Sequence, residues 1–258
     1  MQLTLDGNTA LDNSIDILRE YEPPEGYYLA FSGGKDSVVL KAVADLAGVK
    51  YDAHYNMTTI DPPEVTRFIK KFHPDVEWHV PEKPFWKEVE TRGLPAKNRR
   101  WCCAVYKEIG GFGRKVVTGI RGEESWQRAK RGTYQQCRDG KKWFIHPLMA
   151  WSSSEVWSFI RSRELPYCSL YDEGWDRIGC VLCPYQNRRQ ESLERWPVFW
   201  RLTRQALDVY FTSSEACQSR WANADEMWDW WLHPTRPYPK KYEDRPPSLS
   251  FEGEIGED

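Results

Sequence analysis

The residues best suited to bind an anion lie in one short stretch, 32–37, with the sequence SGGKDS. Its two consecutive glycines allow the backbone to come close to a bulky group, and Lys35 adds a positive charge. An apolar run ends at Phe31 and a helical pattern begins at Val38, so the stretch is expected to turn from a strand into a helix. Because the free N–H groups of a helix start favour negative charge, the sequence predicts a phosphate or pyrophosphate site. An ordinary polar turn is the alternative, and the Walker A spacing is absent.

Further polar residues follow two other predicted strands. The turn 58–64 comes after one of them, and Arg121 comes directly after another. Because the carboxyl ends of parallel strands meet at one edge of a sheet, these residues are expected to converge with the stretch 32–37. Arg121 is expected to contact phosphate. Asp36 either positions Mg²⁺ or caps the helix, and Asp61 either binds metal or ribose or caps its turn.

Four of the seven cysteines form two pairs, Cys102-Cys103 and Cys180-x-x-Cys183. A CxxC turn brings two thiolates to one centre, and the adjacent pair completes a set of four. Neighbouring side chains diverge, which suits the several irons of an iron–sulfur cube better than one zinc ion. Zinc and plain structural or redox thiols are the alternatives. The other three cysteines lack partners at ligand spacing and are expected to pack as small apolar side chains: Cys137, Cys168 and Cys217.

Two groups of cationic residues allow both a functional and a structural interpretation. Arg99, Arg100 and Lys107 flank the first cysteine pair, where they either offset the negative charge of a cluster or form a solvated run. Arginines and tryptophans alternate over 188–200. This pattern fits a face for single-stranded nucleic acid, but an amphipathic helix with its tryptophans in the core is favoured.

The elements that must position these residues alternate along the chain. Strands are expected at 27–31, 51–57, 76–80 and 116–120, and helices at 1–22, 38–47, 65–72, 85–91, from 152 and from 196 to 210. This order predicts an α/β fold with a doubly wound, mostly parallel sheet and a small helical C-terminal extension. We expect a nucleotide-binding domain over 1–190, which includes the paired cysteines. We expect a tryptophan-rich helical extension over 191–258, with a loose acidic tail from 251.

Composition sets further bounds. The 258 residues include 36 basic and 38 acidic side chains, which argues against a uniformly basic nucleic-acid binder but allows a local basic groove. No apolar run is long enough to span a bilayer and the first residues do not resemble a signal peptide, so a cytoplasmic location without membrane contact is expected. In that compartment, cysteines favour metal or redox chemistry over disulfides.

The combined motifs resemble the phosphoadenosine phosphosulfate (PAPS) reductase family of the PP-loop superfamily. Besides SGGKDS, the matching segments are 119–125 (GIRGEES), 146–148 (HPL), 155–157 (EVW) and 177–180 (RIGC). In that superfamily the glycine loop grips the β- and γ-phosphates of ATP while the α-phosphate is attacked. The paired cysteines are similar to those of assimilatory adenylylsulfate reductases, where they hold a [4Fe-4S] cluster.

Two departures from the reductases indicate a different activity. Those enzymes act through a cysteine in a C-terminal Glu-Cys-Gly-Leu-His motif, and the surroundings of Cys217 do not match it. They also tend to lack the lysine of the loop, whereas Lys35 is present and its charge fits a triphosphate. The resemblance therefore implies an ATP pyrophosphatase that uses Mg²⁺, activates an acceptor and lets a sulfur nucleophile displace AMP.

Related proteins that thiolate tRNA or modify DNA with phosphorothioate imply a nucleic-acid acceptor, DNA or tRNA. They also imply a cysteine desulfurase or another sulfur donor as partner. An adenylylsulfate or PAPS reductase with a [4Fe-4S] cluster is one alternative, and a non-catalytic nucleotide-binding iron–sulfur subunit is the other. The predicted cluster ligands are Cys102, Cys103, Cys180 and Cys183. The predicted ATP site is Ser32, Gly33, Gly34, Lys35, Asp36, Ser37, Thr59, Asp61, Gly119 and Arg121, with Lys35, Asp36 and Arg121 as catalytic residues.

Overall fold

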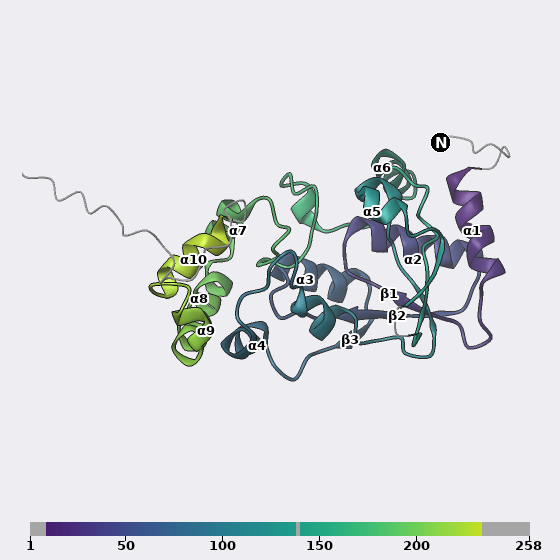
Figure 1. Cartoon of the computed structure of the whole chain (residues 1–258). Helices are drawn as coiled ribbons and strands as arrows, with labels where there is room; N and C mark the ends of the chain where they lie inside the picture. Colours follow the sequence, from purple (N-terminus) through teal and green to yellow (C-terminus); the bar gives the residue numbers. More distant parts are fainter. Residues whose placement is uncertain (1–8, 138–139, 234–258) are drawn as a thin grey trace, which may run out of the picture. The chain divides into compact units, whose positions relative to one another are not determined.

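The computed structural model describes residues 9–137 and 140–233 (Figure 1). The chain divides into two compact units. Unit 1 comprises the segments up to Phe85 and Arg100–Gln186, and unit 2 comprises Trp86–Arg99 and the chain from Asn187 onward. The domain division expected from the sequence stays a prediction, and the acidic tail from 251 lies outside the described residues.

Unit 1 is built on a six-stranded sheet with the order β3-β2-β1-β4-β6-β5. All neighbouring strands pair in parallel except β5 and β6, which are antiparallel. This confirms the predicted α/β fold with a mostly parallel sheet. The strands are β1 (Tyr27–Ala30), β2 (Tyr51–Asn56), β3 (Glu77–His79), β4 (Lys115–Val117), β5 (Tyr134–Gln136) and β6 (Trp143–Ile145).

Helices connect the parallel strands and pack on the sheet through buried apolar side chains. Helix α2 follows β1, packs against α1 and also contacts α6 (Figure 1). Buried side chains of β1 and α2, such as Leu29, Val39 and Val43, form the centre of this packing. The helices of unit 1 are α1 (Ala10–Glu20), α2 (Lys35–Ala47), α3 (Pro63–Phe72), α5 (Trp126–Ala129) and α6 (Ser153–Ser162).

Two parts of the fold differ from the sequence-based expectation. Helix α2 begins at Lys35, three residues earlier than predicted, because Gly34 serves as its N-cap in an extended conformation. The strands β5 and β6 were not predicted, since β5 is short and polar and its Tyr134 is exposed. The first cysteine pair leads into a π-helix, η1 (Cys103–Lys107), in which the N–H of Glu108 donates to the carbonyl of Cys103 at 3.0 Å.

Unit 2 is helical. Tryptophan side chains fill its interior, where the ring centre of Trp200 lies 6.0 Å from those of both Trp228 and Trp231. The indole N–H of Trp231 donates to the carbonyl of Pro95 at 2.7 Å. The helices are α4 (Phe85–Arg92), whose first residue belongs to unit 1, and α7 (Arg189–Arg195), α8 (Pro197–Ser213), α9 (Glu215–Gln218) and α10 (Ala224–Leu232). In the described residues, no helix has the length and apolar character needed to cross a membrane.

Candidate functional site

The predicted phosphate loop joins β1 to the start of α2. Gly33 has a φ of +73°, and a Cβ atom there would lie 2.8 Å from the side chain of Val65 on α3. Glycine is therefore required both for the backbone conformation and for the packing of α3 against the loop. Gly34 then sets the first N–H groups of α2 at the end of the strand, where a helix start attracts anions.

Lys35 is buried at this helix start, with 6% of its surface exposed. Its ammonium group donates to the carbonyl of Asp176 at 3.2 Å and lies 5.3 Å from the ring centre of Tyr171. Its backbone N–H donates to the hydroxyl of Tyr171 at 2.9 Å, and burial raises the pKa of that phenol, so Tyr171 stays neutral. The carboxylate of Asp36 is 3.8 Å from the ammonium group. Both hydrogen bonds that Lys35 donates thus go to neutral oxygens, and a carboxylate lies at ion-pair distance from its ammonium group.

Two hydroxyl groups stabilise the shape of the loop. The hydroxyl of Ser37 donates to the carbonyl of Gly34 at 2.8 Å, and the hydroxyl of Ser32 donates to that of Ser37 at 3.2 Å. The N–H of Gly34 in turn donates to the Ser32 oxygen at 3.4 Å. These bonds fix the loop before any ligand binds, which lowers the entropy cost of binding an anion.

The segment after β4 meets the same helix start, as expected. The Nε of Arg121 donates to Oδ1 of Asp36 at 2.7 Å, and its Nη1 donates to Glu123 at 2.8 Å. A Cβ atom on Gly119 would lie 2.8 Å from the backbone oxygen of Asp36, so a residue with a side chain does not fit there without a backbone shift. With 4% of its surface exposed, Arg121 orients Asp36 in this structure, and its contact with phosphate stays a prediction.

The turn between β2 and α3 uses its polar side chains locally. The carboxylate of Asp61 accepts from the N–H of Thr58 at 2.7 Å. Thr59 has a φ of 63°, which is rare for a β-branched residue, and its hydroxyl accepts from the N–H of Phe85 at 2.8 Å. The roles of Thr59 and Asp61 as nucleotide ligands stay predictions, because both side chains already serve the turn.

The four paired cysteines converge at a second place in unit 1. The pKa of the Cys102 thiol is raised by its hydrogen bond with Cys103, by burial, and by the charges of Cys103, Cys180 and Cys183. The same hydrogen bond lowers the pKa of Cys103 to about 6, with help from Lys107 and Arg100 and against the effect of burial. The other three sulfur atoms therefore lie within electrostatic reach of Cys102.

The CxxC loop is held by the β2–α3 turn. The N–H of Val181 donates to the carbonyl of Ile60 at 2.9 Å, and the thiol of Cys180 donates to the hydroxyl of Thr58 at 3.4 Å. Lys107 is exposed to solvent and lies within electrostatic reach of Cys180, so a Cys180 thiolate would raise the pKa of its ammonium group. Thr58 and Ile60 were not singled out as supports of this site. Their position in a turn after a predicted strand was the available signal.

The cationic residues before Cys102 belong to different units. Arg100 lies near Cys103 and above the ring of Tyr185, at 5.7 Å from its centre. Arg99 donates instead to the carbonyl of Arg92, within unit 2. Of Arg99, Arg100 and Lys107, only the last two therefore lie close enough to the thiols to act on their charge.

The spacing of the cysteine sulfurs provides a test of which group they fit. A tetrahedral zinc ion with Zn–S bonds of about 2.3 Å needs sulfur atoms about 3.8 Å apart. In the described parts of the chain, one group of three metal-donor atoms lies within 4.8 Å of one another, and it belongs to His54, Glu77 and His79. No three cysteine sulfurs there are that close to one another. The described sulfurs therefore do not match a tetrahedral zinc ion, and an iron–sulfur cube, in which each thiolate binds a separate iron, fits them better.

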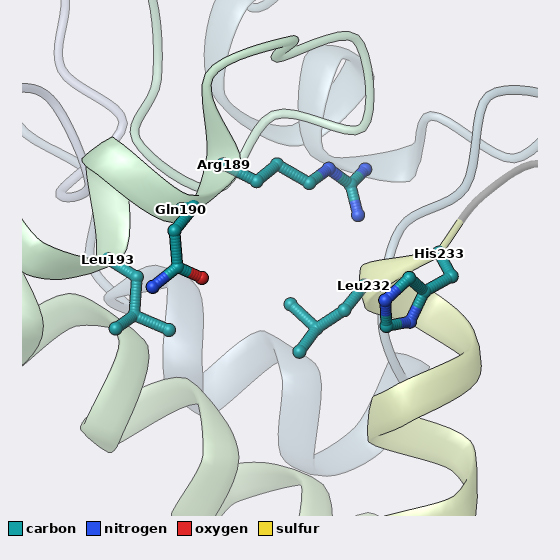
Figure 2. A pocket seen from close by; sticks show the side chains of 5 residues that line it. All are labelled: Arg189, Gln190, Leu193, Leu232 and His233. Carbon is teal, nitrogen blue, oxygen red and sulfur yellow. The ribbon is translucent and has the colours of Figure 1, made fainter.

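A small pocket lies in unit 2, between the ends of α7 and α10 (Figure 2). Arg189 stacks on Trp231 at 4.8 Å and donates to its carbonyl. Trp196 and Trp200 are buried, so the tryptophans of 188–200 pack in the interior, as the favoured interpretation predicts, and do not present rings to solvent. The side chains that line the pocket are Arg189, Gln190, Leu193, Leu232 and His233.

Comparison with known proteins gives a consistent result. Residues 26–186 match the family model described as the phosphoadenosine phosphosulfate reductase domain. An uncharacterised protein of Methanocaldococcus jannaschii is 33% identical over 171 residues, which is 60% of this chain and 40% of that protein. A second uncharacterised protein of the same organism matches over 41% of its length, so the chain spans about two fifths of these relatives.

Two further relatives have named functions. The adenosine 5′-phosphosulfate reductase of Shouchella clausii is 28% identical over 195 residues, which cover 68% of this chain and 80% of that protein. Among solved structures, the PAPS reductase of Candida auris in a phosphate complex superimposes with a TM-score of 0.52 at 17% identity. That match covers 70% of this chain and 97% of the other, and it establishes the shared fold.

Proposed function

Because the chain belongs to the phosphoadenosine phosphosulfate reductase domain family, we propose that unit 1 is an AMP-forming ATP pyrophosphatase that activates a nucleic acid for sulfur incorporation. The observation that carries this proposal is Lys35, a buried ammonium group at a helix start whose direct donor contact is to a neutral carbonyl. A cation in such a place gains most from a multiply charged phosphate chain. ATP offers this chain at its β- and γ-phosphates.

The remaining residues of the loop divide between binding and positioning. The N–H groups at the start of α2 and the hydroxyl groups of Ser32 and Ser37 would surround the pyrophosphate, and Mg²⁺ would supply charge that offsets that of the phosphates. Asp36, held by Arg121, would orient this metal or the loop itself. Arg121 would also add positive charge near the α-phosphate.

In the proposed reaction, an oxygen atom of the acceptor attacks the α-phosphorus of ATP. A new P–O bond forms, the bond from the α-phosphorus to the bridging oxygen breaks, and pyrophosphate leaves with that electron pair. A sulfur nucleophile, supplied by a cysteine desulfurase or another donor, then displaces AMP from the acceptor. DNA and tRNA are the acceptors that we propose to test.

Cys102, Cys103, Cys180 and Cys183 would hold a [4Fe-4S] cluster in the same unit. Such a cluster supplies iron that binds sulfur or transfers electrons. Lys107 and Arg100 would offset the negative charge of four thiolates, which lowers the cost of burying them.

A sulfonucleotide reductase is the second candidate, because the relative in Shouchella clausii has that name and matches 68% of this chain. Adenylylsulfate has no β,γ-pyrophosphate to pair with Lys35, and none of the seven cysteines in the 258 residues lies in the motif through which those reductases act. The ATP-dependent reaction therefore accounts for more of the residues at the site.

The test is an anaerobic assay of the full chain with ATP and, in turn, tRNA, DNA or adenylylsulfate. We expect AMP and pyrophosphate in equal amounts with a nucleic acid, and a rate about a hundredfold or more lower for Lys35→Ala. The exposed Lys83, changed to Ala in the same unit, is the matched control and should leave the rate unchanged.

Two results would overturn the proposal. Sulfite release from adenylylsulfate without ATP turnover would identify a reductase. Tight ATP binding that yields no AMP with any acceptor would identify a non-catalytic nucleotide-binding subunit.

A further inference from the structure

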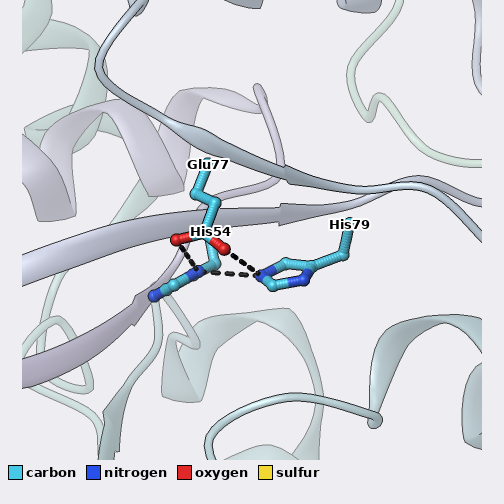
Figure 3. A group of neighbouring side chains, drawn as sticks. All are labelled: His54, Glu77 and His79. Atoms are coloured by element: carbon cyan, nitrogen blue, oxygen red, sulfur yellow. Dashed lines mark hydrogen bonds and ion pairs between the residues drawn. The ribbon is translucent and has the colours of Figure 1, made fainter.

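We propose that His54, Glu77 and His79 form a binding site for one divalent transition-metal ion of the Zn²⁺ or Co²⁺ class, apart from the paired cysteines. The donor atoms of the three side chains converge (Figure 3). Nδ1 of His54 lies 2.8 Å from Nε2 of His79 and 3.6 Å from a Glu77 oxygen, and the other Glu77 oxygen lies 3.9 Å from Nε2 of His79.

The sheet register brings these side chains to one face. His54 on β2 pairs with Glu77 on β3, and Asn56 pairs with His79. Because side chains alternate along a strand, residues 77 and 79 share a face, and their partners at 54 and 56 share it with them. β3 is the edge strand of the sheet, so this face is reached from the edge.

A second set of contacts fixes the orientation of His54. Its Nε2 is hydrogen-bonded to the carboxylate of Asp52, and Arg114 donates to both oxygens of that carboxylate, at 2.6 and 2.5 Å. The two bonds from Arg114 leave this carboxylate as the acceptor of the bond with His54. The Nε2 of His54 then carries the proton, and the lone pair of Nδ1 points at the centre of the site. Carboxylates that orient metal-binding histidines in this way are typical of metal sites.

The ring of His54 is also held by stacking. Tyr28 on β1 lies parallel to it, with ring centres 3.9 Å apart and an angle of 4° between the planes. His54 is buried, whereas the side chains of His79 and Glu77 are 33% and 64% exposed. One ligand is therefore fixed in advance and the other two are open to an ion arriving from solvent.

The chemistry of the donors selects the ion. Two imidazole nitrogens with one carboxylate oxygen suit Zn²⁺, Co²⁺ or Ni²⁺ rather than Mg²⁺. Without metal, Nδ1 of His54 and Nε2 of His79 share a hydrogen bond in which His79 is the donor if the proton of His54 is on Nε2. To bind an ion through Nε2, His79 takes the tautomer with its proton on Nδ1. Zn–N bonds of about 2.0 Å at tetrahedral angles require the two nitrogens to separate to about 3.3 Å. A fourth position stays available to water, and no step of the proposed ATP reaction depends on this site.

The test is a Co²⁺ titration of the full chain, purified anaerobically so that the paired cysteines keep their own occupant. Binding at the proposed site adds visible d–d absorption without a sulfur-to-cobalt charge-transfer band. We expect one Co²⁺ per chain, and an affinity lower by about tenfold or more in His79→Gln and in Glu77→Gln. His233→Gln and Glu82→Gln change exposed residues outside the set and should bind as the unmodified chain does.

The proposal is overturned if the His79 and Glu77 variants bind Co²⁺ as tightly as the unmodified chain, or if all bound Co²⁺ shows the charge-transfer band of thiolate ligation. It is equally overturned if no Co²⁺ binds to folded protein, because the three side chains then form a hydrogen-bonded network alone. Glu77 is exposed at an edge strand, so its variant is expected to keep the fold.

Discussion

The phosphate loop and the cysteine site are built in opposite ways. The loop consists of six consecutive residues, 32–37, whose geometry follows from two glycines and a helix start. The cysteine site joins the start of a π-helix to a CxxC turn far along the chain, and the β2–α3 turn holds the second of these segments. An anion site can thus be encoded locally, whereas a four-thiol site depends on the tertiary fold.

The two places also differ in how they use a lysine: Lys35 is buried and Lys107 is exposed. Lys35 donates to the carbonyl of Asp176, a neutral partner that a phosphate can replace. Lys107 lies beside Cys180, and its pKa is raised by the charge of that thiolate. The first arrangement suits a ligand that comes and goes, and the second suits a permanent negative group.

The strongest test of this contrast removes one ligand of the cysteine site. Cys180 is buried among the other thiols, and a cube with four cysteine ligands loses one corner in Cys180→Ala. We expect nearly complete loss of iron and sulfide, measured chemically after anaerobic purification, while ATP binding is retained. Cys137→Ser is the matched control and should keep its iron. Zinc in place of iron, or unchanged iron in Cys180→Ala, would contradict the assignment.

A smaller effect is expected on the phosphate side. In Gly119→Ala the new Cβ atom would lie 2.8 Å from the backbone oxygen of Asp36, so the start of α2 must shift. We expect the free energy of unfolding to fall by about 1–3 kcal/mol, and ATP to bind more weakly, with the iron content unchanged. Thermal unfolding and nucleotide titration measure these effects. Gly179→Ala is the control, because a Cβ atom there meets nothing within 4 Å. If the two variants unfold with the same free energy, the steric argument is wrong.

The smallest effect concerns pH. His146 donates or accepts a hydrogen bond at 2.7 Å with Thr118, which precedes Gly119, and burial lowers its pKa to about 4, with Arg131 and Arg128 adding to the effect. The folded state therefore binds this proton more weakly than the unfolded chain, whose histidine pKa is 6.5.

The contribution of His146 to the free energy of unfolding is thus greatest above pH 6.5 and falls as the pH approaches 4. Between about pH 7.5 and about pH 5.5 the loss from His146 should be about 1 kcal/mol, measured by urea unfolding at each pH. His146→Gln should flatten this dependence and His233→Gln should not. His73, whose pKa burial also lowers to about 4, contributes a similar slope that remains in both variants. An unchanged slope in His146→Gln would show that His146 is not the group that titrates.

Much of the fold was predictable because its signals are local. The strands β1 and β4 contain short apolar runs, and α2 and α3 have periodic apolar faces bounded by glycine or proline. The strands β5 and β6 carry polar or half-exposed residues, so their pairing depends on neighbours rather than on pattern. The inclusion of 86–99 in unit 2 likewise depends on contacts such as that of Trp231 with Pro95, which no local pattern encodes.

At the site, the sequence predicted which residues carry chemistry better than it predicted their partners. The meeting of Arg121 with the start of α2 followed from strand order, but its ion pair with Asp36 needs side-chain geometry. The supporting contact of Tyr171 was missed because a single hydroxyl group leaves no pattern in sequence, and that of Thr58 had only its place in a turn after a predicted strand as a signal. The histidines had no ligand spacing along the chain, and only the pairing of β2 with β3 brings His54 and His79 together.

The contacts of one short stretch of chain have a wider consequence. Tyr171 and Asp176 hold the backbone and ammonium group of Lys35, and Cys180 and Cys183 follow within the next seven residues. Inserting or deleting even one residue in this connection would therefore disturb the nucleotide site and the thiol site together. Homologous chains that keep both sites are expected to keep the length of this connection, whatever residues they place in it.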